Sequence, residues 1–118
     1  PFAYSEYGYA CKIVDLKNAQ AVFTTSFLQD ECTFFGHISE YLIPNQASSE
    51  YTGIKFSIGL GDVYEKTNAV YDCREENEFK DIAKQESENI MTKTNLSQRD
   101  LSQLIEFEEI IDTLEFIK

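Results

Sequence analysis

Alternation of apolar and polar positions is clearest at residues 51–60, YTGIKFSIGL. Every second residue from Thr52 to Leu60 falls on one face, and the apolar ones share it. A period of two with one apolar face is typical of an antiparallel strand whose other face meets water. We therefore expect Ile54, Phe56 and Ile58 to be buried together, with Lys55 and Ser57 exposed.

Further segments of the first 72 residues also predict strands, because they are rich in β-branched and aromatic residues. KNAQ at 17–20 fits a hairpin turn, and the alternating aromatics of residues 1–9 fit an additional edge strand. The polar segment 44–50 begins with Pro-Asn, a strong breaker, and fits a loop. The predicted strands are residues 11–16, 21–28, 33–43 and 63–72.

The pattern changes to helical spacing after Cys73. Residues 76–93 contain no Gly, Pro or Val, and their apolar residues recur at intervals of three and four. Asn95 or Ser97 is placed to cap a last helix that runs to about residue 117. Strands first and helices last is typical of an α+β fold. We expect one domain over residues 1–118, with an antiparallel sheet of about five strands in 1–72 and helices at 76–93 and 97–117.

Residues suited to catalysis are few. His37 is the one histidine, and alternation places it on the same face as Phe35 and Tyr41. Cys32 lies five residues upstream, so a Cys–His nucleophile pair is conceivable. A histidine packed among aromatics with one hydrogen bond is commoner, and we expect that. The three cysteines show no metal-binding spacing, so we expect no metal, no cofactor and no enzymatic activity.

Gly59-Leu60-Gly61 has the glycine content of a phosphate-binding loop. Such a loop needs a strand before it and a helix after it, so that the helix N-terminus meets the phosphate. Because a strand is expected to follow, the sequence predicts a hairpin turn with positive φ instead.

The net charge is −11 and is unevenly distributed. Residues 1–60 carry six acids and three bases, and residues 61–118 carry fifteen acids and seven bases. This charge repels nucleic acid and anionic lipid, and it attracts a basic protein. No apolar run is long enough to span a membrane, and the N-terminus does not read as a signal peptide. Three cysteines without a framework fit a cytoplasmic protein with reduced thiols.

The last predicted helix combines acidic and apolar residues on the side away from its core stripe. The core stripe consists of Leu104, Phe107, Ile110, Ile111 and Leu114. In one interpretation the helix is sandwiched between the sheet and helix 76–93, which would bury Ile105 and Phe116. In the other it faces a partner. The candidate partner-binding residues are Ile105, Glu106, Glu108, Glu109, Asp112, Glu115 and Phe116, with Asp72, Glu75, Glu76 and Glu78 as second choice.

In size, charge and lack of catalytic residues, the chain resembles the immunity proteins that bacteria pair with basic nuclease toxins. The resemblance is one of general character, and no motif residue is carried over. It implies a basic protein partner, a nuclease toxin domain whose cleft the acidic side chains would occupy, and a monomer rather than a dimer. The alternatives are a homodimeric secretion chaperone or adaptor, an inhibitor that mimics nucleic acid, and a small enzyme.

Overall fold

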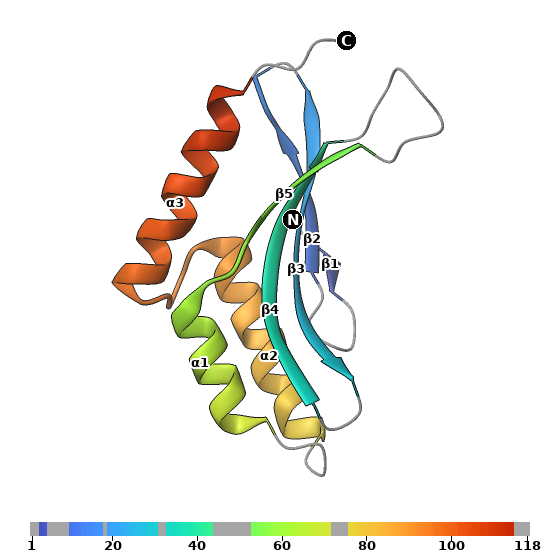
Figure 1. Ribbon diagram of the computed structural model, residues 1–118, viewed down its shortest axis with the longest axis vertical. Helices are drawn as coiled ribbons and strands as arrows, with labels where there is room; N and C mark the ends of the chain where they lie inside the picture. The colour runs from blue at the N-terminus through green and yellow to red at the C-terminus, as the bar shows by residue number, and fades with distance from the viewer. Residues whose placement is uncertain are drawn as a thin grey trace.

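A computed structural model describes residues 3–4, 10–17, 19–30, 33–43, 53–71 and 76–114. The strands form one antiparallel sheet in sequence order, and three helices cover one of its faces (Figure 1). The α+β fold is confirmed, with four strands of five residues or more and a first strand of two. The elements are β1 (Ala3–Tyr4), β2 (Ala10–Asp15), β3 (Gln20–Asp30), β4 (Thr33–Ile43), β5 (Ile54–Ile58), α1 (Gly61–Val70), α2 (Glu76–Thr92) and α3 (Gln98–Thr113).

Helix α1 replaces the strand that the sequence predicts at 63–72, so that prediction is wrong. Its buried residues are Val63 and Thr67, which are four apart and therefore share one side of a helix. The predicted hairpin turn is wrong as well. Gly36 and Gly53 are the described glycines with positive φ, whereas Gly59 and Gly61 lead from β5 into α1 without one. The β-branched residues of this segment favour a strand by intrinsic propensity, but tertiary contacts stabilise it as a helix.

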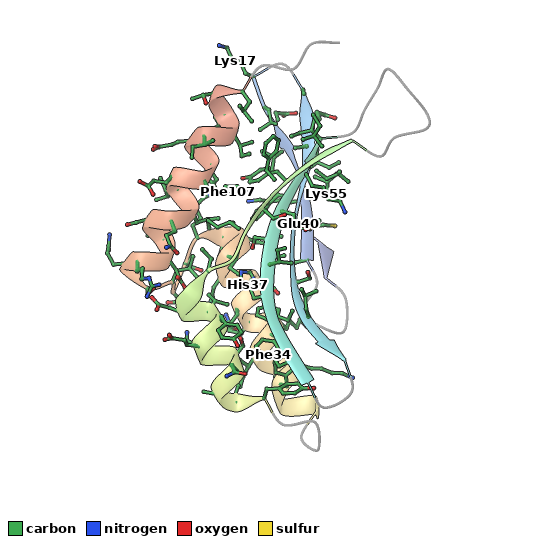
Figure 2. All side chains as sticks on the ribbon, in the orientation of Figure 1. Lys17, Phe34, His37, Glu40, Lys55 and Phe107 are labelled. Atoms are coloured by element: carbon green, nitrogen blue, oxygen red, sulfur yellow. The ribbon has the colours of Figure 1, made fainter. Side chains whose placement is uncertain are left out.

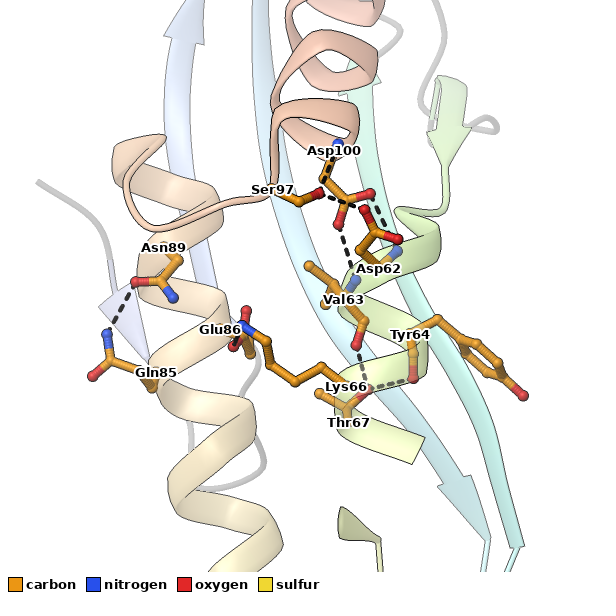
Figure 3. Close-up of polar contacts among 10 residues, drawn as sticks. All are labelled: Asp62, Val63, Tyr64, Lys66, Thr67, Gln85, Glu86, Asn89, Ser97 and Asp100. Carbon is orange, nitrogen blue, oxygen red and sulfur yellow. Dashed lines mark hydrogen bonds and ion pairs between the residues drawn. The ribbon is translucent and has the colours of Figure 1, made fainter. Parts of the chain in front are cut away.

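The start of α1 is held by a carboxylate from α3. Buried Asp100 accepts hydrogen bonds from the backbone N–H groups of Asp62 (3.2 Å) and Val63 (2.9 Å) (Figure 3). Ser97 caps α3 by accepting the N–H of Asp100 at 3.1 Å, and its hydroxyl donates to the carboxylate of Asp62. Helix N-termini carry unpaired N–H groups and partial positive charge, so carboxylates stabilise this junction of two helices.

The core lies between the sheet and the helices. The ring of Phe23 on β3 lies 4.7 Å from that of Tyr41 on β4, and Tyr41 lies 5.6 Å from Phe107 of α3. These contacts attach α3 to the sheet. Figure 2 shows Phe107, His37 and Phe34 on the helix side of the sheet. The buried apolar residues are Ala10, Ala21, Phe23, Phe27, Tyr41, Ile43, Leu60, Val63, Phe79, Ala83, Ile90, Met91, Leu104 and Ile111.

A β-bulge changes the alternation of β4. Leu28 pairs with Gly36, but Gln29 pairs with Phe34, so one residue of β4 is skipped. Phe34 therefore joins the helix side, where it stacks on Tyr64 and Tyr71. The sequence places Phe35 beside His37, but the side chain of Phe35 lies outside the described residues. Gly36 has φ +126°, and a Cβ there would meet the ring of Tyr64 at 3.1 Å, so this position requires glycine.

Strand β5 has the predicted faces but not the predicted burial. Lys55 and Ser57 are exposed as expected, while Phe56 and Ile58 are half-buried. Ile54 is 53% exposed, so the prediction that it is buried is wrong. β5 is an edge strand, and its first residues lie at the end of the sheet away from α1 and α2 (Figure 1). Alternation sets which face a residue occupies, and the position of the helices sets how deeply it is buried.

We expect Phe23→Ala to cost about 3–5 kcal/mol of unfolding free energy, because it removes a fully buried ring and leaves a cavity. Urea unfolding followed by circular dichroism measures the cost. Ile13→Ala is the control, since Ile13 lies on the neighbouring strand β2 but points to the opposite face of the sheet and is exposed, and it should cost less than about 1 kcal/mol. Equal costs for the two variants would contradict the described core.

We expect Asp100→Ala to cost about 2–4 kcal/mol, because the N–H groups of Asp62 and Val63 lose their acceptor. The same urea experiment measures the loss. Asp81→Ala, which removes an exposed acid from α2, should change the free energy of unfolding by less than about 0.5 kcal/mol. A tolerated Asp100→Ala would show that the junction of α1 and α3 contributes little to stability.

Candidate functional site

The outer face of α3 carries exposed carboxylates beside exposed isoleucines. Glu106 and Glu109 point away from the core between Ile105 (40% exposed) and Ile110 (61% exposed), and exposed Asp112 lies beside Ile105 on the helix surface. We call these five residues the acidic strip. Among the described residues, its three carboxylates have no lysine or arginine within ion-pair distance. The strip is therefore a charged surface with apolar flanks and no internal counter-ion.

The exposure of Ile105 decides between the two interpretations of this helix. α3 begins next to the start of α1 and runs along the other end of the sheet, so it is not enclosed between the sheet and α2 (Figure 1). The interpretation that buries Ile105 is therefore wrong. Phe116 lies outside the described residues, as does Glu115, and the described helix ends at Thr113.

Ile110 is the residue of this surface that the sequence assigned to the core. Fully buried Leu104 and Ile111 are seven residues apart and set the inward direction of α3. Each residue turns the helix by about 100°, so Ile110 lies well to one side of Ile111. A helical wheel centred on Leu104 and Ile111, rather than on the whole apolar set, would have shown Ile110 at the surface.

Glu108 is turned away from the acidic strip. It is half-buried and forms an ion pair with Lys93 at 3.0 Å. Lys12 on β2 completes this group, since its ammonium donates to the carbonyl oxygen of Met91 at the end of α2, 3.0 Å away. A cation at a helix C-terminus matches the helix dipole. Burial and the charge of Lys93 lower the pKa of Lys12, and Glu108 opposes that shift. This group joins α2, α3 and the sheet.

The negative charge of α3 extends to the core beneath it. Burial raises the pKa of the Tyr41 hydroxyl, and the charges of Glu108 and Asp112 raise it further. Tyr41 therefore stays neutral and protonated at physiological pH.

The second-choice set of partner-binding acids falls on positions whose side chains the structure does not describe. Asp72 and Glu75 lie outside the described residues, and Glu76 and Glu78 are in the first turn of α2 with side chains that the structure does not describe.

His37 belongs to a buried polar cluster. Its Nδ1 lies 3.3 Å from Oγ1 of Thr25, its Nε2 lies 3.4 Å from Oγ of Ser39, and Ser39 donates to Thr25 at 3.1 Å. The ring of Phe27 lies 5.2 Å from that of His37, so the expected packing among aromatics is present. Thr25 and Ser39 are completely buried, so a substrate cannot reach this pair of hydroxyls. Cys32, the other half of the conceivable nucleophile pair, lies outside the described residues.

Metal-binding geometry does not occur in the described part of the chain, where no three His, Cys, Asp or Glu side chains converge. The buried acid of α2, Glu86, forms an ion pair with Lys66 of α1 at 2.9 Å (Figure 3). Its second carboxylate oxygen is buried without a hydrogen-bond partner among the described atoms. This pair connects α1 to α2 and leaves one unsatisfied acceptor between them.

Acid should destabilise the fold through His37. Burial lowers the pKa of His37 from 6.5 to about 4. The unfolded chain thus binds this proton below pH 6.5, and the folded chain binds it only below about pH 4. The neutral ring therefore contributes its full stability above pH 6.5, and about 3 kcal/mol is lost as the pH falls from 6.5 to 4.

Urea unfolding of the wild type and of His37→Gln across this pH range measures that loss. Glutamine keeps hydrogen-bonding groups at the site but does not titrate, so the variant should show a shallower decline between pH 6.5 and 4. Carboxylates titrate equally in both proteins and cancel in the comparison. Parallel pH profiles would mean that His37 is solvated in the folded state.

Comparison with known proteins found no relative from which a function could be inferred. No family model, no curated protein and no solved structure matches the chain. None of the described helices has the length and apolar character needed to cross a membrane. The acidic strip, the buried His37 cluster and the distribution of charge are therefore the observations on which a function must rest.

Proposed function

We propose that this protein is an acidic inhibitor that binds a basic protein, as an immunity protein binds a nuclease toxin. The observation that carries the proposal is the acidic strip: three exposed carboxylates next to two exposed isoleucines, without a basic partner among the described residues. The basic partner supplies the counter-charge that the strip lacks. Its substrate cleft is the natural target, because lysines and arginines that hold phosphates also bind carboxylates.

The two kinds of side chain have different roles in this binding. Exposed carboxylates steer the encounter with a cationic surface and raise the association rate. Ile105 and Ile110 then lose their contact with water, and apolar anchors of this kind mainly slow dissociation. α3 also has no basic residue in its last turn. A cationic partner beside Asp112 would supply the positive charge that this helix end favours.

The class and location of the protein follow from the same proposal. We infer an inhibitor rather than an enzyme, since the one histidine is neutral, buried and occupied with Thr25 and Ser39. We infer a cytoplasmic location, and the free thiol of Cys11 fits a reducing compartment. The partner proposed is a basic nuclease domain, and the gene next to this one is the first place to seek it.

Reversing charges on the strip should slow association with that nuclease domain. We expect Glu109→Lys combined with Asp112→Lys to lower the association rate constant by about tenfold or more at physiological salt, because the residues nearest the basic cleft then repel it. Surface plasmon resonance against the purified domain measures the rate. For the unaltered protein, the association rate should also fall as salt rises, since screening limits exposed charges to about 8 Å.

The matched control is Glu65→Lys combined with Asp81→Lys, which changes net charge equally at exposed positions of α1 and α2. It should leave association within about twofold. Ile110→Ala should speed dissociation while the thermal unfolding midpoint stays unchanged, because Ile110 is not part of the core. Equal rates for the two charge-reversed proteins would remove α3 from the interface and leave only the effect of net charge.

A further inference from the structure

The face of the sheet opposite the helices carries a row of apolar side chains. Ile13 on β2 pairs with Val22 on β3, Val22 pairs with Leu42 on β4, and Leu42 pairs with Lys55 on β5. All four side chains point away from the helices. Ile13 is 72% exposed and Val22 and Leu42 are partly exposed. We call the side chains on this side of β2–β5 the open face.

The open face continues along β3 and β4 with further apolar residues. Leu28 is 45% exposed, and Ile38 is partly exposed. Between these two and the row of Ile13 lie short polar side chains and Glu40, which accepts a hydrogen bond from Ser57. Open faces of antiparallel sheets are usually polar, so large aliphatic side chains at both ends of this one indicate an association surface.

Charge is divided between the two layers of the molecule. The five strands contain three acids and two bases, whereas the three helices contain twelve acids and four bases. The charged side chains described on the open face are Asp15, Glu40 and Lys55, of both signs, and Figure 2 shows Glu40 and Lys55 on this side. The helix layer therefore repels a second copy of this acidic chain, and the open face does not.

We propose that the open face docks a second copy of this chain, sheet against sheet. Two sheets pack about 10 Å apart. Each helix layer lies about 10 Å beyond its own sheet, so the two negative layers end about 30 Å apart. That separation is more than three screening lengths at physiological salt, where the Debye length is about 8 Å. The acidic strips of both copies remain on the outside of such a dimer.

The size of the open face sets the strength of this association. Strands β2, β3, β4 and β5 contain 6, 11, 11 and 5 residues, spaced about 3.4 Å along a strand with strands about 4.8 Å apart, so they cover roughly 540 Å² in projection per copy. Two copies then bury roughly 1,000 Å², which is the lower limit for a specific interface. The dimer is therefore weak and depends on concentration. The resemblance to immunity proteins implies a monomer. The proposed dimer differs from that expectation, because most of the negative charge lies on the helix layer and little of it on the open face.

Sedimentation velocity on the full chain from about 10 µM to 1 mM tests the proposal. We expect the unaltered protein to shift from monomer to dimer within this range. Ile13→Lys should abolish the shift, because it places a cation in the apolar row, and Leu28→Lys should weaken it. Ile110→Lys is the matched control, since it makes the same substitution at an exposed isoleucine on α3, and it should dimerise like the unaltered protein.

Salt distinguishes this interface from the one proposed for the acidic strip. An apolar contact between like-charged copies should strengthen, or stay unchanged, when NaCl is raised from about 0.05 to 0.5 M, whereas binding of a basic partner should weaken. A monomer throughout the concentration range overturns the proposal. So does a dimer that Ile13→Lys leaves intact, or one that salt dissociates. None of these three results bears on the proposed nuclease inhibitor, because Ile13 and the acidic strip lie on opposite sides of the molecule.

Discussion

The carboxylate of Asp100 is the contact on which the arrangement of the helices depends. It is buried, belongs to the first turn of α3, and accepts the first N–H groups of α1. A buried charge is tolerated only when hydrogen bonds and favourable dipoles surround it, and the N-termini of two helices provide both. Ser97 and Asp62 complete the junction. Because the two helix starts must meet at this point, α3 leaves it along the sheet and away from α2.

This direction of α3 produces the surface that we associate with function. Leu104, Phe107 and Ile111 hold the helix against the sheet, and Phe107 does so through Tyr41. The opposite side of the helix has no covering element among the described residues. A sandwiched helix would have buried Ile105 and brought its carboxylates near the lysines of α2. The open arrangement leaves the acidic strip exposed and without counter-ions.

The same architecture separates charge from apolar surface. Acids gather in the helices, where first-turn positions and solvent-facing sides accept them, and the sheet is nearly neutral. One layer thus suits a cationic partner and the other suits an uncharged surface. The two proposed interfaces respond oppositely to salt for this reason, and they do not compete for the same residues.

The sequence by itself determined that strands come first and that α2 and α3 come last, together with the faces of β5 and the outward direction of Glu106, Glu109 and Asp112. These follow from periods of 2 and 3.6, which are local properties of the backbone. Local periodicity did not determine how deeply a residue is buried, since Ile54 and Phe56 share a face and differ in exposure. Ile110 was assigned to the core for the same reason, because a pattern gives the direction of a side chain but not the position of its neighbours.

Only the tertiary structure decided that residues 61–70 form a helix rather than a strand. It also decided that the glycines before them connect β5 to this helix and do not form a hairpin turn. Val63, Thr67 and Val70 favour a strand by propensity, but Asp100, 37 residues after Val63 in the chain, supplies the cap that the start of a helix needs. That same carboxylate occupies the N-terminus where a phosphate would bind, which gives a better reason than the predicted strand for rejecting a phosphate loop. Capping, the bulge at Gly36 and the apolar open face depend on residues distant in sequence, and a single sequence does not show which distant residues meet.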